Sequence, residues 1–393
     1  MDESSSPITD IEIGNRLRIA REAAGLTQGT VAERIGVART TLLAIEQGQR
    51  KARIGEIQEL AGVYGLTVNA LMRTEAIHVD LEPKFRRLPE SSLRGVDSAT
   101  RTLTSLAKAE VELEDLLGVR RRRNYPPERP LLPGNVVHQA EHDAAELRDR
   151  LGLGGAPILD IVTLLETELG ARVYTRRLDP KVSGLFVFDD ALGACILLNA
   201  NHPLTRRVHT AAHELGHFLS TRREPEILEL NRPARSREEV YANAFARAFL
   251  MPARSVKARF EEVTAGADRL TRRHIIVLSH MLRVSRQATV QRLEELGLTK
   301  QGTWSWFEAN GGITDEQARQ VLGDLWKLYD DDGAGRSVSL RLGLLVAQVW
   351  QKGLLSEGQI ARLLELDRIE LRALLDDAGG VDAGPVVEAA DLF

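Results

Sequence analysis

The sequence predicts a mainly α-helical chain of several domains, with one small β-sheet near its centre. The length of 393 residues suffices for two to four domains. Apolar residues recur at helical spacing towards both ends of the chain, whereas short strand-like runs gather in residues 184–199. A basic, proline-rich stretch at residues 119–135 separates an amino-terminal part from a central part.

Five segments are expected from these changes in character. They are an amino-terminal five-helix bundle (10–73), a helical connector with a basic proline-rich linker (74–134), a central α+β core (135–264), a helical extension of that core (265–300), and a helical carboxy-terminal domain (301–393).

The amino-terminal segment shows apolar periodicity for five short helices, near residues 12–24, 28–35, 39–47, 54–64 and 67–72. Thr27 is placed to cap the second helix, and Gly36-Val37 makes the tight turn before the third. Residues 14–73 carry a charge balance of +4, whereas the whole chain carries −4. Basic character is therefore concentrated in this bundle, as expected for a nucleic-acid partner.

This bundle resembles the Cro/C1-type (XRE) helix-turn-helix domain over its full length. The resemblance implies DNA binding, with the third helix in the major groove. Arg39, Thr40 and Thr41 would then contact base edges, while Gln28, Gln49 and Arg50 would contact phosphates. The alternative is a small bundle that binds only protein.

Residues 92–118 predict one long amphipathic helix or a broken pair. Such a helix either pairs two copies of the chain as a homodimer on two half-sites, or packs on its own chain. The four arginines at 120–123 in the linker are interpreted as a solvated run, with a phosphate contact as the second interpretation.

The central segment contains His213-Glu214-Leu215-Gly216-His217, an H-E-x-x-H pattern in a stretch expected to be helical. Histidines four residues apart lie on one face of a helix, so both imidazoles can reach a single metal ion. Glu214 lies near enough to act on a metal-bound water as a general base. The pattern therefore indicates a zinc-dependent hydrolase.

A catalytic zinc site needs a third protein ligand. Small and large apolar residues alternate at helical spacing between Glu238 and Pro252, which predicts a closely packed helix. Glu239 in its first turn is the expected third ligand, with Glu238 as the runner-up. The simpler interpretation is that both glutamates only complement the helix dipole.

Together, "ILLNANHPLTRRVHTAAHELGHFL" and "EEVYANAFARAFLMP" resemble the ImmA/IrrE metallopeptidases, zinc-dependent endopeptidases that cut helix-turn-helix repressors. The resemblance covers roughly residues 135–300 and implies a zincin-like α+β core. By this resemblance, His213, His217 and Glu239 would bind the metal ion, and Glu214 would be the general base. His209 departs from the family pattern, and its distance along the helix from His217 makes it a packed group rather than a fourth ligand.

Zinc is the expected cofactor, with manganese as the alternative for a nitrogen and oxygen ligand set. An oxyanion donor is also needed, and the sequence does not choose among Tyr241, His202, His209 and Tyr174. Two short strands, 184–188 and 194–199, are expected upstream. They form either an exposed edge that holds an extended substrate or an ordinary supporting hairpin.

The carboxy-terminal third contains two helix-turn-helix-like spacings, at residues 274–298 and 356–376, for which packing is the favoured role. Ser356 and Gln359 predict a capping box, and Asp367 is placed to cap the next helix. The four tryptophans are interpreted mainly as core of a small helical domain, with a stacking surface for nucleic acid as the alternative. They are Trp304, Trp306, Trp326 and Trp350.

The preferred hypothesis is a DNA-binding transcriptional regulator that is also a metalloendopeptidase. Its expected substrate is a repressor-type protein or its own chain, in a stress, DNA-damage or phage response, with DNA as the trigger. The alternative is a transcription factor whose peptidase-like domain is a non-catalytic ligand or interaction module. Neither a signal peptide nor a membrane span is predicted, and Cys195 is the only cysteine, so we expect a cytoplasmic protein without membrane contacts.

Overall fold

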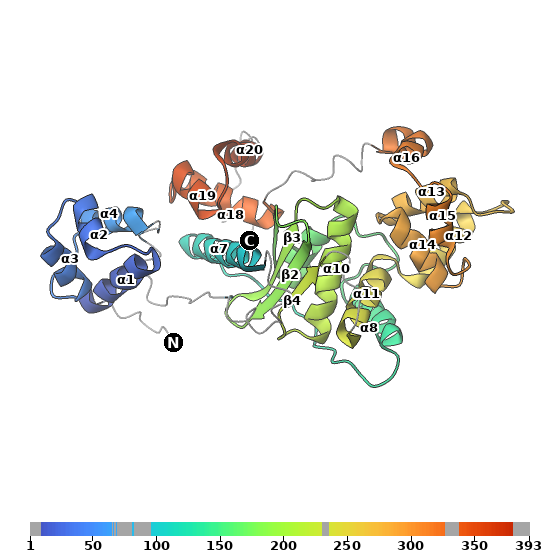
Figure 1. Cartoon of the computed structure of the whole chain (residues 1–393), viewed down its shortest axis with the longest axis horizontal. Coiled ribbons are helices and arrows are strands. Elements are labelled where there is room, and N and C mark those ends of the chain that lie inside the picture. Colours follow the sequence, from blue (N-terminus) through green and yellow to red (C-terminus); the bar gives the residue numbers. More distant parts are fainter. Residues whose placement is uncertain are drawn as a thin grey trace, which may run out of the picture. The chain divides into compact units, whose positions relative to one another are not determined.

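The computed structural model describes residues 9–64, 66, 68, 81, 96–229, 236–326 and 338–379 (Figure 1). These residues are mostly helical, with one four-stranded sheet in the central part, as the sequence predicts. Within the described residues, no helix is both long and apolar enough to cross a membrane. The chain divides into two compact units, which are considered separately below.

The amino-terminal bundle forms as expected around Leu17, Leu42 and Leu60, which are fully buried. Thr27 caps the second helix by accepting a hydrogen bond from the Thr30 amide, and Gly36 takes a left-handed φ of 68° in the turn. The fifth predicted helix, 67–72, lies outside the described residues apart from Val68. The four described helices are α1 (Asp10–Ala23), α2 (Gln28–Arg34), α3 (Arg39–Glu46) and α4 (Ile54–Tyr64).

Helix α7 (Val96–Leu116) is one continuous helix rather than a broken pair. Leu103, Leu106 and Leu113 on it are completely buried within the single chain.

The central sheet has the strand order β1-β3-β2-β4. β1 (Arg172–Arg176) runs parallel to β3 (Gly193–Asn199), and β2 (Val182–Asp189) pairs antiparallel with both β3 and β4 (Glu226–Glu229). The predicted strands 184–188 and 194–199 are thus the two central strands. Of the two interpretations, the structure contradicts the exposed edge, because β1 pairs with the outer side of β3 and β4 pairs with the outer side of β2.

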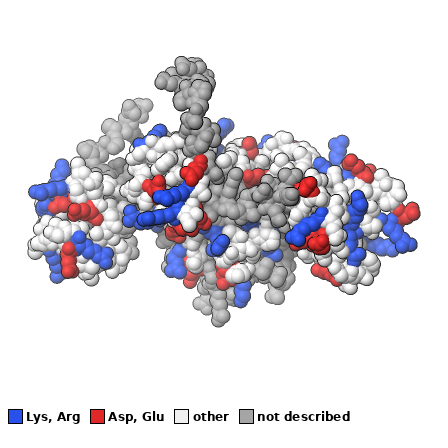
Figure 2. Space-filling model, turned by 90° about the horizontal axis from the view of Figure 1, so that it is seen from above, with Lys and Arg blue, Asp and Glu red and all other residues white. Residues whose placement is uncertain are grey.

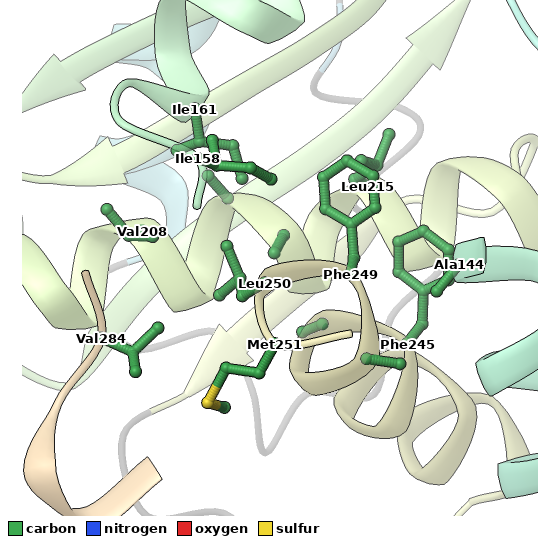
Figure 3. Close-up of a cluster of buried hydrophobic side chains, with 14 of the residues drawn as sticks. Ala144, Ile158, Ile161, Val208, Leu215, Phe245, Phe249, Leu250, Met251 and Val284 are labelled. Atoms are coloured by element: carbon green, nitrogen blue, oxygen red, sulfur yellow. The ribbon is translucent and has the colours of Figure 1, made fainter. Parts of the chain in front are cut away.

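Helices α10 (Leu204–Ser220), α11 (Arg237–Leu250) and α8 (Val136–Arg150) pack in succession beside the sheet (Figure 1). One hydrophobic core joins them to the sheet, and Figure 3 shows Leu215, Phe245 and Phe249 within it. The remaining elements of the central part are α9 (Ile161–Leu164), the π-helical turn η2 (Leu165–Leu169), α12 (Ala253–Val263), α13 (Arg272–Leu282), α14 (Arg286–Glu295), α15 (Thr303–Ala309), α16 (Asp315–Leu322) and η3 (Gly323–Trp326).

The prediction of a solvated arginine run is corrected in part: Arg121 and Arg123 donate to backbone carbonyls of the central domain, whereas Arg120 and Arg122 are exposed. Residues 121–133, here named the strap, lie on the central domain: the Asn124 amide donates to the Leu169 carbonyl at 3.1 Å. The Arg129 amide donates to the Leu219 carbonyl at 2.7 Å. Arg121 donates to the backbone of Ala171, and Arg123 to the Asp190 carbonyl at 2.8 Å. The accepting carbonyls lie directly before β1 and directly after β2, and each guanidinium group offers five N–H donors to such acceptors.

Two glycines make room for the strap. Gly170 has a φ of 74°, and a Cβ there would meet the Arg122 carbonyl oxygen at 2.0 Å. Gly193 has a φ of 82°, and its Cβ would meet the Tyr125 hydroxyl at 2.1 Å. The Tyr125 ring then packs edge-on against Phe218 of α10, with ring centroids 5.0 Å apart.

The carboxy-terminal helices α18 (Leu340–Gln351), α19 (Glu357–Leu363) and α20 (Arg368–Gly379) carry the predicted caps. Ser356 and Gln359 form the capping box, and Asp367 accepts from the amides of Ile369 and Glu370 at 2.8 Å. The tryptophans do not share one core as expected. Trp304 and Trp326 pack against the central core, whereas Trp306 is 58% exposed and Trp350 is 37% exposed.

Candidate metal centre and DNA-binding face

The predicted metal ligands come together at the contact of α10 and α11. The His213 and His217 Nε2 atoms are 3.1 Å apart. One Glu239 oxygen lies 3.6 Å from the His213 Nε2, and the other lies 3.6 Å from the His217 Nε2. Within the described residues, this trio and the group His142, Asp143 and Glu146 are the clusters with metal-ligand spacing. The second group has two exposed members and no connection to the H-E-x-x-H pattern.

Close packing of two helices brings Glu239 to the histidines. Gly216 faces α11, and a Cβ at this position would stand 2.9 Å from the Ala242 Cα. The backbones of α10 and α11 therefore approach each other more closely than larger side chains at Gly216 and Ala242 would permit. Ser236 caps α11 by accepting from the Glu239 amide at 3.2 Å, which fixes Glu239 in the first turn.

The two histidine rings are oriented by their neighbours. The His217 Nδ1 lies 3.3 Å from the Thr221 hydroxyl, so its Nε2 points to the cluster. Burial lowers the pKa of His213 well below its usual value, and the nearby His217 and His209 lower it further. A hydrogen bond with the Asn243 side chain acts in the opposite direction. A neutral imidazole is the form that binds a metal ion.

Glu214 is completely buried against strand β2. A Cβ on Gly184 would stand 3.2 Å from the Glu214 Oε1 and 2.6 Å from the Thr210 methyl carbon. Gly184 therefore makes the space that this carboxylate occupies. The sequence analysis missed Gly184 and Gly216 as site-forming residues, although a glycine inside an apolar strand signals such a close approach.

The candidate oxyanion donors lie in different environments. The buried Tyr241 hydroxyl donates to Asp143 at 2.8 Å, which accounts for it as a packing residue. His202 has its Nε2 3.1 Å from the Pro180 carbonyl oxygen, and Tyr174 is buried on edge strand β1. The His209 ring centroid is 6.5 Å from that of His213, and burial lowers the His209 pKa to about 4.

The predicted base-reading residues lie at the start of α3. Arg39 and Thr40 are exposed, and Thr41 is half-buried. Leu42 is fully buried in the next position and anchors this turn to the bundle core. In Figure 2, the visible side of the bundle carries both basic and acidic side chains.

The three residues predicted to contact phosphates differ in how far their side chains are engaged within the bundle. Gln49 is exposed, whereas the Gln28 amide donates to Glu46 at 2.8 Å. Arg50 donates to Glu56 at 2.8 Å. The hydrogen bond from Arg50 lowers the pKa of Glu56. A phosphate contact by Arg50 therefore has to compete with this ion pair.

A buried ion pair lies behind the α2–α3 turn. Arg21 donates to Glu46 at 2.7 Å and to the Leu26 carbonyl at 3.0 Å. The Glu46 side chain is only 1% exposed. The sequence analysis did not single out either residue, because their meeting depends on tertiary packing.

The fold and the cluster define a metallopeptidase-like domain in a chain that also carries a DNA-binding bundle. Comparison with protein-family models agrees: residues 166–294 match the IrrE N-terminal-like domain, and residues 12–73 match a helix-turn-helix domain. The chain thus joins an XRE-type helix-turn-helix domain to an ImmA/IrrE-type metallopeptidase domain.

Two wider comparisons add little. No curated protein matches the chain significantly. The crystal structure of ComR from Streptococcus suis aligns over 96% of this chain and 97% of its own, with 12% identity and a TM-score of 0.17. At that TM-score the alignment carries no argument about this chain.

Proposed function

We propose that this chain is a DNA-binding regulator whose central domain is a zinc-dependent metalloendopeptidase. In this proposal His213, His217 and Glu239 hold the zinc ion, and Glu214 is the general base. Arg39, Thr40 and Thr41 read base edges, while Gln28, Gln49 and Arg50 contact phosphates.

The observation that carries the proposal is the cluster of ligand atoms: the two Nε2 atoms are 3.1 Å apart, and each lies 3.6 Å from a different oxygen of Glu239. Zinc bonds of about 2.0–2.1 Å at tetrahedral angles separate ligand atoms by about 3.3 Å. The residues present therefore fit zinc without a large rearrangement. Two imidazoles and one carboxylate leave the fourth position open, as in catalytic rather than structural sites.

When bound, zinc would supply a water of lowered pKa and would polarise the scissile carbonyl. Glu214 follows His213 directly in α10, and its carboxylate is held against β2. From there it accepts the proton of the attacking water and delivers it to the leaving amine. A side chain at position 184 would crowd this carboxylate, because a Cβ there would stand 3.2 Å from its Oε1.

A repressor-type protein is the proposed substrate, in a stress, DNA-damage or phage response with DNA as the trigger. The contacts of the strap argue against self-cleavage within this segment. Its backbone hydrogen bonds at Asn124 and Arg129 would have to break before this segment could enter the cluster. A second protein is therefore favoured over cleavage within residues 121–133.

The test begins with zinc binding by the full chain. Glu239→Gln is expected to lose the ion, whereas Glu238→Gln, which changes the neighbouring glutamate, is expected to retain one zinc per chain. Zinc content is measured by mass spectrometry of the native protein. Equal zinc content in both variants would assign Glu239 to helix capping and remove the ligand assignment.

Activity is then tested with the wild type and Glu214→Gln, with zinc or manganese. Each protein is incubated alone, with duplex DNA, with single-stranded DNA and with a helix-turn-helix repressor. Metal-dependent fragments from the wild type only would support the peptidase. One bound zinc without fragments under any condition would instead favour a regulator with a non-catalytic module.

A further inference from the structure

Three turns in the described chain consist of a left-handed residue, one apolar residue and one capping residue, followed by a helix that begins with arginine. The α1–α2 turn closes in the same way, with Gly25 left-handed and the Leu26 amide donating to the Arg21 carbonyl, but it leads into Gln28. In α2–α3, Gly36 takes a left-handed φ of 68°, between Ile35 and Val37. In α13–α14, Arg283 takes a φ of 58° between Leu282 and Val284, and in α19–α20, Glu365 takes a φ of 52° between Leu364 and Leu366. Outside glycine, the described residues adopt positive φ only at Arg283 and Glu365.

The hydrogen bonds of the turns agree residue by residue. The Val37 amide donates to the Ala32 carbonyl at 3.0 Å, and the Leu366 amide donates to the Ala361 carbonyl at 2.9 Å. The Val284 amide donates to the corresponding carbonyl, that of Ser279, at 3.2 Å. Each turn is followed by one capping position and then by a helix that begins with arginine: Arg39, Arg286 and Arg368.

The three second helices differ in what they leave exposed. Arg286 of α14 donates to the Thr314 carbonyl at 2.7 Å and pairs with Asp315, and Val290 and Leu293 lie in the central core. The side chains of α14 are therefore used for packing within the central domain. Helix α20 has the burial pattern of α3 instead.

At the start of α20, Arg368 and Ile369 are exposed where α3 exposes Arg39 and Thr40. Leu371 is 1% exposed where α3 buries Leu42. Ile369 is 82% exposed, which is unusual for a large apolar side chain and leaves it free to contact a partner. Arg372, one turn after Arg368, has a side chain that is 70% exposed.

We infer that α19–α20 is a second DNA-binding helix-turn-helix, with Arg368, Ile369 and Arg372 of α20 facing the major groove. Arginine pairs with guanine edges, and an apolar side chain contacts the thymine methyl group. A duplex with two separately read blocks is thus the partner.

The net charge of the carboxy-terminal segment bears on how it would contact DNA. Residues 338–379 hold five basic and six acidic side chains, in contrast to the basic amino-terminal bundle. Glu357 opens α19, where α2 opens with Gln28, and it lies 3.6 Å from the Arg372 guanidinium. Because phosphate contacts supply most of the affinity, α20 adds sequence selectivity to binding that the first domain dominates.

The test is a selection of random duplexes by the full-length protein. Two preferred blocks are expected for the wild type, and Arg39→Ala is expected to lose one of them. Arg368→Ala/Arg372→Ala is expected to lose the other and to weaken binding to the selected duplex about ten- to hundredfold. Lys352→Ala, which removes an exposed charge from the same segment, keeps both blocks. A single block, with affinity unaffected by the double substitution, would overturn the inference.

The double substitution could lose binding simply by unfolding α20, so a second variant tests the inference independently. Glu357→Gln leaves the capping box of Ser356 and Gln359 intact and removes a negative charge near the phosphates. Binding to the selected duplex is expected to become severalfold tighter, with a steeper dependence on salt. Unchanged or weaker binding by this variant would count against DNA as the partner.

Discussion

The candidate metal cluster and the candidate DNA-reading helix α3 place their side chains in opposite environments. His213, Glu214 and His217 are completely buried and are held by neighbouring backbone, whereas Arg39 and Thr40 lie exposed. The buried site is therefore assembled by folding itself. The exposed face takes its final arrangement from a partner, so its residues tolerate substitution with little cost to folding. Substitutions in the two regions should thus separate cleanly into effects on chemistry, stability and binding.

The largest expected effect is on catalysis. Glu214→Gln should reduce proteolysis by about 10²- to 10⁴-fold, because the amide cannot accept the proton of the water. Zinc content should remain that of the wild type, since Glu214 is not among the three ligands. Initial cleavage rates and metal analysis of the same preparation test both statements. A variant that also loses zinc would show that Glu214 has a structural part in the site.

The buried pair of the amino-terminal bundle comes next. Glu46→Ala should destabilise the bundle by about 3–5 kcal/mol, because it leaves the Arg21 charge buried without its carboxylate. Glu22→Ala is the matched control: its carboxylate lies 3.5 Å from Arg21, but its side chain is 51% exposed. The control should cost less than about 1 kcal/mol. Denaturant unfolding of both variants gives the comparison, and equal costs would contradict it.

A pair of identical substitutions tests the helix contact. Gly216→Ala should destabilise the central domain by about 1–3 kcal/mol and weaken zinc binding, because the new methyl group meets Ala242. Gly62→Ala in α4 has open space around it and should stabilise its helix by up to about 1 kcal/mol. Thermal unfolding and zinc titration distinguish the two. A Gly216→Ala variant as stable as the wild type would mean that α10 and α11 separate easily.

On the exposed side, Arg39→Ala should weaken binding to a cognate duplex by about 1–3 kcal/mol while the stability of the bundle stays unchanged. Fluorescence anisotropy with the selected duplex and with a scrambled duplex measures the loss of selectivity. An equal loss on both duplexes would assign Arg39 to a phosphate contact rather than to a base.

The smallest expected effect concerns Arg50 and Glu56. Because Arg50 lowers the folded pKa of Glu56, the carboxylate stabilises the bundle above its unfolded pKa, and this contribution disappears as pH falls through the folded value. Glu56→Gln should therefore be slightly less stable than the wild type at pH 7 and equally stable in acid. Unfolding curves from pH 7 to pH 3 test this, and a constant difference would exclude the ion pair as its source.

The sequence predicted that His213, His217 and Glu239 lie together, because their placement follows local rules of helix geometry. Helical spacing places His213 and His217 on one face. Only two glutamates, Glu238 and Glu239, lie in the first turn of the next helix, so few candidates remained for the third ligand. It also placed Thr27, Ser356 and Asp367 as caps, since capping depends on adjacent residues.

What the sequence could not predict depends on contacts between distant segments. Strands β1 and β4 cover the central pair, although nothing in their own residues marks them as edges. The strap looks like a solvated linker by composition, yet it binds backbone carbonyls across the domain. The exposure of Trp306 likewise reflects the placement of α15, which no local pattern encodes.

The strap also ties the end of helix α10 to a segment about ninety residues earlier in the chain. The Arg129 amide of the strap donates to the carbonyl of Leu219, two residues beyond His217. The cation–π contact of Arg222 with Phe218, at 4.2 Å, lies beside the same anchor, and Arg222 also donates to the strap at Pro126. Loss of the strap contacts at Pro126 and Arg129 would therefore release the carboxy-terminal end of the helix that carries His213 and His217.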